Sequence, residues 1–241
     1  HRGSTFWTPE ETESAYRWAR EIGADYLECD MQVSKDGVVL ALHDDNLKRT
    51  TNIETVFGET LRRVIRKNYY MKIGYSETEA EEKVKADEAN FVPNLPAYYT
   101  YEELLMLDAG SWFNNENLEE ALPGLAKEKQ YISTLEDLIM YSKGYRLIRD
   151  RNQPGMPRQY SIVGKTGETI TSLSGTADIV KYDFGYEIDP VWEAGNKNIP
   201  GIYIEFKEPW LNPKGFEQIV YDVLANTQDM NIIEKPEPED W

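Results

Sequence analysis

The sequence predicts an α/β fold in which strands alternate with helices around a parallel sheet. Two patterns predict it: a strand–turn–strand signal over residues 26–42, and a helical repeat directly before that signal. Polar and apolar side chains alternate along residues 26–33. Because successive side chains of a strand point to opposite faces, Glu28 and Asp30 share one face while the apolar set packs behind them.

The second strand of the signal covers residues 38–42, after a tight turn at Lys35-Asp36-Gly37. It is continuously apolar, as expected of a parallel strand that is buried on both faces. The strand ends at His43 and Asp44, so we expect these two residues at a strand tip that opens onto a site.

The helix before the first strand is predicted to start at Thr8 and to end at Gly23. Thr8 is the expected N-cap, Pro9 takes the first helical position, and Glu11 completes a capping box. Apolar residues recur at helical spacing at positions 15, 18, 19 and 22. With a strand ahead of His1, this helix would complete a right-handed βαβ unit.

Further helices are predicted by capping signals. Ser76 begins a helix that reaches about residue 90 and is polar nearly all round. Thr100 with Glu103, and Ser133 with Glu136, form capping boxes ahead of apolar runs. These signals place three helices between the second and the last predicted strand.

The C-terminal half also contains strand signals. Residues 202–207 alternate like a half-buried strand, and a helix with one apolar stripe is expected to start at Asn212-Pro213. Short strands are expected at 160–163 and 178–182.

Composition indicates one globular domain and excludes some partners. The chain has 241 residues, is 40% hydrophobic and carries a net charge of −17. This charge argues against binding to nucleic acid or to an anionic membrane surface. No apolar run approaches the roughly 20 residues of a membrane span, so no stable membrane insertion is expected. The single Cys29 cannot form an intrachain disulfide and alternates to the buried face.

A series of short motifs runs through the chain in a fixed order. They are HRG at 1–3, PE at 9–10, GAD at 23–25, E-x-D at 28–30, KDG at 35–37, HD at 43–44, RTT at 49–51, and the segments 100–113, 132–138 and 202–209. Together these motifs resemble the glycerophosphodiester phosphodiesterase family. The resemblance covers roughly half of the residues.

The resemblance implies a TIM (β/α)8-type barrel of the phospholipase C-like phosphodiesterase kind. Only strands two, three and four of that pattern can be placed, so we expect an incomplete, roughly half barrel in one domain, residues 1–241. Insertions are expected at about 52–98 and 145–200. The family pattern has a strand before the HR pair, so we expect that either a leader was removed or the chain was trimmed, and with a leader we expect a periplasmic or secreted location.

The role of the first insertion has two interpretations. Its many charges indicate a solvated surface segment. Alternatively it is a lid whose tyrosines touch substrate, namely Tyr69, Tyr70, Tyr75, Tyr98 and Tyr99.

Two carboxylates at positions i and i+2 of one strand repel each other unless a cation lies between them, which predicts a hard divalent metal site. Glu205 lies on the polar face of another strand. By resemblance, Glu28, Asp30 and Glu205 match the three metal ligands of the family. Oxygen ligands suit either Ca²⁺ or Mg²⁺.

The resemblance also assigns the catalytic and substrate-binding residues. His1 and His43, the only histidines, match the family's two catalytic histidines, and we favour His43 as the acid that protonates the leaving group. Arg2 and Lys207 are candidates for binding the phosphate oxygens, or form ion pairs with the metal carboxylates, or do both.

Other residues near the motifs have less specific expectations. Trp112 and Phe113 line a headgroup pocket or pack in the core. The loop residues Asp44, Asn46, Arg49 and Thr50 are expected to shape the loop after residue 42 and not to touch substrate.

Three functions remain open at this point. The first is a metal-dependent phosphodiesterase that hydrolyses small glycerophosphodiesters to glycerol 3-phosphate and an alcohol by acid/base catalysis with two histidines. The second is a related phospholipase D acting on lysophospholipids or sphingomyelin, and the third is a non-catalytic, truncated barrel module. The oligomeric state is not predicted.

Overall fold

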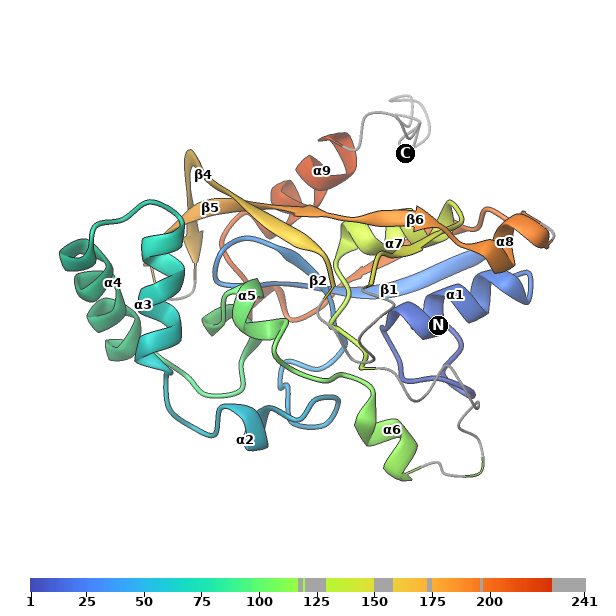
Figure 1. The fold of residues 1–241 in the computed structure, drawn as a ribbon, viewed down its shortest axis with the longest axis horizontal. Helices are drawn as coiled ribbons and strands as arrows, with labels where there is room; N and C mark the ends of the chain where they lie inside the picture. The colour runs from blue at the N-terminus through green and yellow to red at the C-terminus, as the bar shows by residue number, and fades with distance from the viewer. Residues whose placement is uncertain (117–118, 120–128, 150–157, 173–174, 196, 227–241) are drawn as a thin grey trace.

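The fold, a computed structural model, is described here for residues 1–116, 119, 129–149, 158–172, 175–195 and 197–226 (Figure 1). Helices and strands alternate irregularly along the chain. The helices are α1 (Glu13–Glu21), α2 (Ile53–Val56), α3 (Arg63–Lys72), α4 (Glu77–Ala89), η1 (Pro96–Tyr98), α5 (Tyr101–Leu104), α6 (Ser111–Glu116), α7 (Leu135–Ser142), α8 (Pro190–Ala194), η2 (Pro209–Leu211) and α9 (Phe216–Asn226). The strands are β1 (Tyr26–Val33), β2 (Val39–Ala41), β3 (Tyr145–Leu147), β4 (Tyr160–Ser172), β5 (Gly175–Phe184), β6 (Tyr186–Ile188) and β7 (Gly201–Phe206).

The central sheet has the strand order β2-β1-β7. Strand β7 pairs with β1 in parallel, whereas β2 pairs with β1 in antiparallel orientation. Two antiparallel ladders, β3–β6 and β4–β5, complete the strands of the described residues. The architecture is therefore mixed α/β, and the described strands form no closed barrel.

The prediction of a parallel strand over residues 38–42 is wrong. The connection from β1 to β2 is a short turn in which the Ser34 amide donates to the Val38 carbonyl at 2.9 Å. Such a turn can join only antiparallel neighbours, because a parallel partner needs a crossover of a dozen or more residues. The continuous apolar character of β2 reflects burial of all three of its residues.

Helix α1 begins four residues later than predicted. Its N-cap is Thr12, whose side-chain oxygen accepts from the Ala15 amide, and not Thr8. Glu11 has a φ of 59°, which is incompatible with a helix at that position. Its carboxylate is buried and serves the sheet, as described below, so it does not complete a capping box. Gly23, with φ 89°, ends the helix as predicted.

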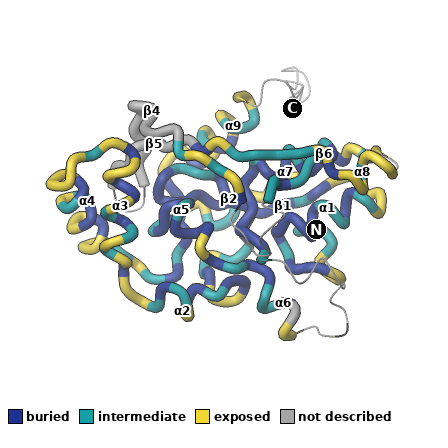
Figure 2. The backbone as a smooth tube through the Cα atoms, in the orientation of Figure 1, coloured by how far each residue is buried: buried dark blue, intermediate teal, exposed yellow. Residues whose placement is uncertain are grey.

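The core is one cluster of buried side chains that extends from the central sheet, α1 and α7 to helices α2–α5, and Figure 2 shows the buried backbone in dark blue. The predicted apolar face of β1 is confirmed, since Leu27, Cys29, Met31 and Val33 are all at most 1% exposed. Fully burying side chains of this size stabilises the fold by roughly 1.5–3 kcal/mol each.

The predicted helix start at Ser76 and the predicted capping box at Thr100 are confirmed. The box predicted at Ser133 is shifted by one residue, because Thr134 and Asp137 form it in place of Ser133 and Glu136. The carbonyl of Ser133 accepts from the Ala41 amide at 2.8 Å. Residue 133 therefore still belongs to the strand-like segment beside β2.

The first insertion folds as helices α2 to α4, with α3 and α4 at the left end of the molecule in Figure 1. Arg66 joins α3 to α4 through a buried ion pair with Asp87 at 2.5 Å, and it holds the insertion to α5 through a second buried ion pair with Glu103 at 2.7 Å. The hydroxyls of Tyr69 and Tyr70 donate to the buried carboxylates of Asp36 and Asp87.

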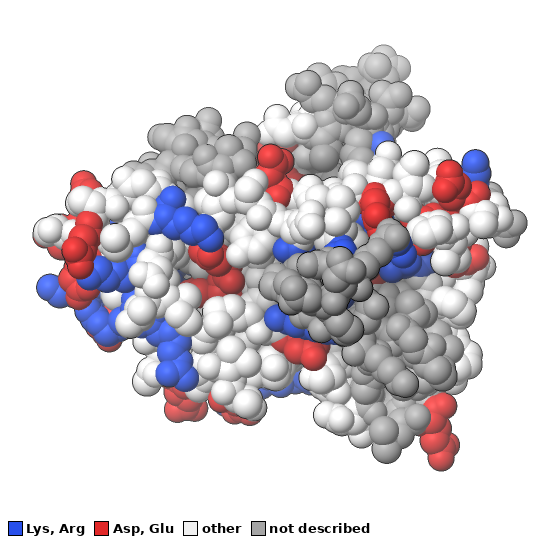
Figure 3. Space-filling model, viewed as in Figure 1, with Lys and Arg blue, Asp and Glu red and all other residues white. Residues whose placement is uncertain are grey.

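Tyr99 is also buried, while Tyr75 and Tyr98 make ring contacts within the insertion. These contacts support the fold, and the idea that the segment covers substrate stays a prediction. Lys, Arg, Asp and Glu side chains lie next to one another around α3 and α4 in Figure 3, as expected of a solvated surface.

The C-terminal elements follow the predicted order with different limits. The strands expected at 160–163 and 178–182 belong to a much longer hairpin, β4–β5. Strand β7 is where it was predicted, and α9 starts at Phe216 instead of residue 212. Asn212 has another role, because its side-chain oxygen accepts from the Val33 amide at 2.8 Å. No helix among the described residues is long and apolar enough to cross a lipid bilayer.

Candidate functional site

The first three residues form a tight turn that lies against β1. Gly3 has a φ of 81°, and a Cβ at this position would approach the backbone of Ala15 to 2.7 Å, so only glycine fits. The turn places the amide of Arg2 where it donates to Glu28 Oε2 at 2.6 Å. The HRG motif is therefore fixed against the strand that carries the two neighbouring carboxylates.

Three carboxylates gather where β1 and β7 run side by side. Asp30 is the register partner of Glu205 in the parallel ladder, and Glu28 lies two residues earlier on the same face. One oxygen of each carboxylate lies within 4.8 Å of those of the other two. The sequence-predicted ligands Glu28, Asp30 and Glu205 are thus brought together by the pairing of these two strands.

Two cationic side chains adjoin this cluster. Arg2 Nε lies 3.2 Å from Asp30 Oδ2, and Lys207 Nζ lies 3.3 Å from Asp30 Oδ1 and also pairs with Glu205. The expected ion pairs between these residues and the carboxylates are therefore present.

The cluster has more acceptors than donors. Both carboxylate oxygens of Asp30 and Oε1 of Glu28 are buried and accept no hydrogen bond within the described residues, since the contacts of Asp30 with Arg2 and Lys207 lack hydrogen-bond geometry. Buried carboxylate oxygens are normally satisfied by donors or by a metal ion. An all-oxygen set of this kind fits a hard divalent cation such as Ca²⁺ or Mg²⁺.

The electrostatics of the cluster differ from one residue to the next. Burial raises the pKa of Glu28, and the neighbouring charge of Asp30 raises it further. The hydrogen bond from Lys207 lowers the pKa of the exposed Glu205 carboxyl. The charges of His43 and Arg2 lower this pKa further. A bound cation would favour the ionised form of all three groups.

His43 lies at the end of the β2 segment and belongs to a chain of charged contacts. Its Nδ1 lies 2.7 Å from Asp44 Oδ1. Arg49 donates to both oxygens of Asp44, at 2.6 and 2.9 Å, and to both oxygens of Glu10, at 2.6 and 3.1 Å. The hydrogen bonds from Arg49 lower the pKa of Asp44 to about 2, which keeps this carboxylate ionised.

The two histidines approach the cluster from different segments. His1 precedes Arg2, whose amide binds Glu28, and His1 is exposed. His43 is partly exposed, and its charge acts on Glu205. The structure thus brings both histidine-bearing segments to the same carboxylates.

Sequence reasoning missed two carboxylates and one amide that support the site. Glu10 binds Arg49 and Arg2, and Glu11 accepts from the Asp30 amide at 3.1 Å and from the Tyr16 hydroxyl. The Gln32 amide donates to the carbonyls of Leu42 and Asp44, which fixes the segment carrying His43. In the sequence, Glu10 and Glu11 were part of the segment interpreted as a helix start. Gln32 was visible as a polar residue in the alternating pattern of β1.

The other residues near the motifs contribute to packing and to the shape of the loop. Phe113 is buried in the core, whereas the Trp112 ring lies 5.8 Å from the Arg49 guanidinium. The Asn46 side chain accepts from the Lys48 amide at 2.9 Å, which shapes the loop as expected. Burial raises the pKa of the Cys29 thiol, so it remains a protonated core residue.

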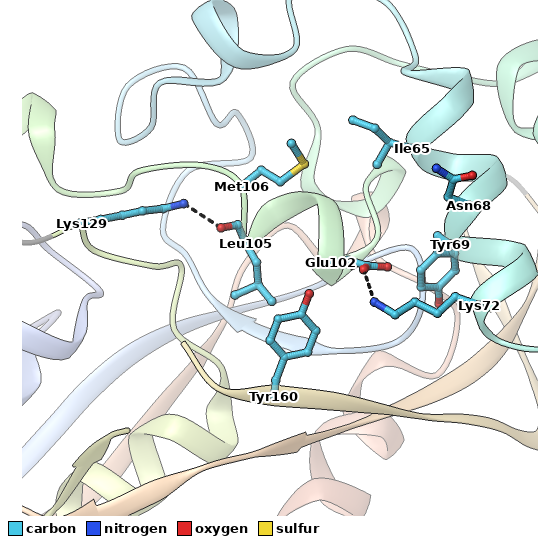
Figure 4. A pocket seen from close by; sticks show the side chains of 9 residues that line it. All are labelled: Ile65, Asn68, Tyr69, Lys72, Glu102, Leu105, Met106, Lys129 and Tyr160. Carbon is cyan, nitrogen blue, oxygen red and sulfur yellow. Dashed lines mark hydrogen bonds and ion pairs between the residues drawn. The ribbon is translucent and has the colours of Figure 1, made fainter. Parts of the chain in front are cut away.

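A cavity of about 580 Å³ lies apart from these residues, between α3, α5 and the start of β4 (Figure 4). None of the predicted catalytic, metal-binding or phosphate-binding residues lines it, whereas Tyr69, one of the tyrosines of the lid interpretation, does. Its two lysines are engaged, because Lys72 binds Glu102 at 2.6 Å and Lys129 donates to the Leu105 carbonyl at 2.9 Å. The cavity therefore offers no chemistry that is linked to the carboxylate cluster.

Comparisons with known proteins agree with the motif series. The family model described as "Glycerophosphoryl diester phosphodiesterase family" matches residues 1–159. A glycerophosphodiester phosphodiesterase of Bacillus subtilis is 29% identical over 139 residues, which cover 58% of this chain and 33% of that protein. A glycerophosphoinositol inositolphosphodiesterase of Mus musculus is 29% identical over 184 residues, which cover 72% of this chain and 28% of that protein.

Among solved structures, a glycerophosphodiester phosphodiesterase from Agrobacterium tumefaciens has 24% identity and a TM-score of 0.36, covering 60% of this chain and 41% of that one. The matches thus extend over about a third of the length of the two curated relatives named here.

Proposed function

Because the chain belongs to the glycerophosphoryl diester phosphodiesterase family, we propose that it carries the site of a metal-dependent phosphodiesterase. The proposed reaction is hydrolysis of a small glycerophosphodiester to glycerol 3-phosphate and an alcohol. The observation that carries the proposal is the set of three carboxylates within 4.8 Å, in which both oxygens of Asp30 are buried without a hydrogen-bond donor. The β1–β7 pair would be part of the TIM-type barrel that the family implies.

Glu28, Asp30 and Glu205 would hold the cation, either Ca²⁺ or Mg²⁺. When bound, a divalent cation neutralises the charge on phosphoryl oxygens. Arg2 and Lys207 lie on either side of Asp30. They would add donors to the phosphate oxygens and offset the negative charge that three carboxylates bring to an anionic substrate.

The two histidines would move the protons. Hydrolysis adds the oxygen of water to phosphorus and breaks the bond from phosphorus to the alcohol oxygen, which must gain a proton. An imidazole titrates near neutral pH and suits both tasks. We assign the proton donor of the leaving alcohol to His43, which Asp44 orients, and the opposite role to His1.

Metal binding tests the carboxylate cluster without reference to catalysis. Titration calorimetry with Ca²⁺ and with Mg²⁺ should show one site in the parent protein and none in Asp30→Asn. Glu205→Gln should weaken the site. The matched control is Glu54→Gln, which also removes an exposed carboxylate that is paired with a lysine, and this variant should bind as the parent does.

Catalysis is tested on the intact protein with glycerophosphocholine as substrate. Activity should require the divalent cation, stop on chelation, and fall by about 10²–10⁴-fold in His43→Ala, the usual contribution of a positioned acid or base. Unchanged activity in the presence of chelator and in His43→Ala would refute the mechanism. Preferential cleavage of sphingomyelin or lysophospholipids would instead support the phospholipase D alternative.

A further inference from the structure

The side chain of Arg49 lies between two carboxylates outside the three-carboxylate cluster. It forms a fork with Asp44 on one side, through Nε and Nη2, and a second fork with Glu10 on the other, through Nη1 and Nη2. Asp44 in turn contacts Nδ1 of His43. A planar guanidinium with several fixed donors is suited to joining two carboxylates in a defined geometry.

Both ends of this chain of contacts are held by the surrounding structure. Glu10 is only 10% exposed in its side chain and also lies 3.5 Å from Arg2 Nη1. The loop on the other side is held by Gln32, whose amide donates to the Asp44 carbonyl. Asp44 is therefore held through both its backbone and its carboxylate, and the carboxylate is held by Arg49.

The consequence concerns the tautomer of His43. An ionised carboxylate only accepts hydrogen bonds, so the 2.7 Å contact with Asp44 requires the proton of the neutral ring to be on Nδ1. The lone pair is then on Nε2, on the opposite side of the ring from Asp44. Without a fixed carboxylate, a neutral imidazole exchanges between its two tautomers and its ring can rotate.

We propose that Arg49 is a positioning residue that, anchored by Glu10, holds Asp44 so that neutral His43 keeps its proton on Nδ1 and presents Nε2 for proton exchange with substrate. The inference rests on the proposed function for what His43 does with Nε2. The positioning itself does not depend on activity.

The test is nitrogen NMR of the protein with ¹⁵N-labelled histidine, at a pH at which imidazole is neutral. Only two histidines contribute, and His43→Gln identifies the signals of His43. In the parent protein we expect the shifts and couplings of a ring protonated at Nδ1. In Arg49→Gln we expect the signals to move toward a mixture of the two tautomers.

The matched control is Arg63→Gln. Arg63 also contacts two carboxylates and is similarly exposed, but it lies on α3 in the first insertion. It should leave the His43 signals unchanged. Arg49→Lys keeps the positive charge without the two forks, so we expect its His43 signals to lie between those of the parent protein and those of Arg49→Gln. A circular dichroism spectrum verifies that each variant is folded.

Two results would overturn the proposal. The first is parent-like His43 signals in folded Arg49→Gln. The second is parent-like His43 signals in Arg49→Lys, because the role of Arg49 would then be its charge alone. In the active protein, Arg49→Gln should lower kcat by about 10–100-fold, as is typical of residues that orient a functional group, with little change in KM. If the parent protein cleaves no phosphodiester while the tautomer still shifts in Arg49→Gln, the proposed function fails and the positioning role stands.

Discussion

Replacing Asp44 by Asn should reduce stability at neutral pH and leave it unchanged in acid. The pKa of Asp44 is lowered from 3.8 to about 2, chiefly by its hydrogen bonds from Arg49. A shift of this size corresponds to roughly 2.5 kcal/mol at 1.36 kcal/mol per pKa unit. Because the Arg49 side chain is 44% exposed, solvent screening reduces the expected loss in Asp44→Asn to about 1 kcal/mol.

The sign of the pH dependence follows from the direction of the shift. A carboxyl whose pKa is lowered by folding binds more protons in the unfolded state, so its contribution is complete above the unfolded value of 3.8. The contribution is lost as the pH falls through about 2. The difference between parent and Asp44→Asn should therefore be constant near neutrality and shrink below about pH 4.

Urea unfolding over this pH range measures the difference directly, provided that the slope of the unfolding free energy against urea stays the same. The exposed neighbour Asp45 provides the control, since Asp45→Asn should show no such pH-dependent loss. A difference that is absent at neutral pH, or that persists unchanged in acid, would refute the assignment of the ion pair as a source of stability.

Three further predictions concern the frame around the site. Arg66→Ala should destabilise the protein by about 3–5 kcal/mol in urea unfolding, because it leaves the buried Glu103 carboxylate without its cation, whereas Asp87 keeps its ion pair with Lys35; a loss below about 1 kcal/mol would contradict this. Gly144→Ala should lower the melting temperature, since φ is 92° and a Cβ would overlap the Trp192 ring; an unchanged melting temperature would contradict this, because movement of the ring would not relieve the backbone strain. Thr134→Ala should lower the free energy of unfolding by about 1 kcal/mol through loss of the α7 N-cap, whereas Thr134→Ser should keep most of this stability.

The residues of the carboxylate cluster could be predicted from the sequence because strand periodicity is local. Alternation alone places Glu28 and Asp30 on one face of β1. That Glu205 joins them was predicted from the motif resemblance and not from spacing. In the structure it follows from the parallel register of β1 and β7, which local sequence does not encode.

Other features depend on contacts that no local pattern contains. Glu11 matched a capping box, yet its carboxylate accepts from the Asp30 amide and the Tyr16 hydroxyl, and this tertiary role overrides the local signal. The direction of β2 was misjudged because an apolar run was interpreted as a parallel strand. The short turn before it was the more reliable signal.

The origin of the site in two distant strands also bears on how the protein folds. Asp30 and Glu205 are separated by most of the chain, and pairings of such long range form slowly because a large loop must close first. The helical segments between them can form earlier from local contacts. We therefore expect cation binding to appear among the last events of refolding, so that a metal-sensitive signal in a stopped-flow experiment would report completion of the β1–β7 ladder.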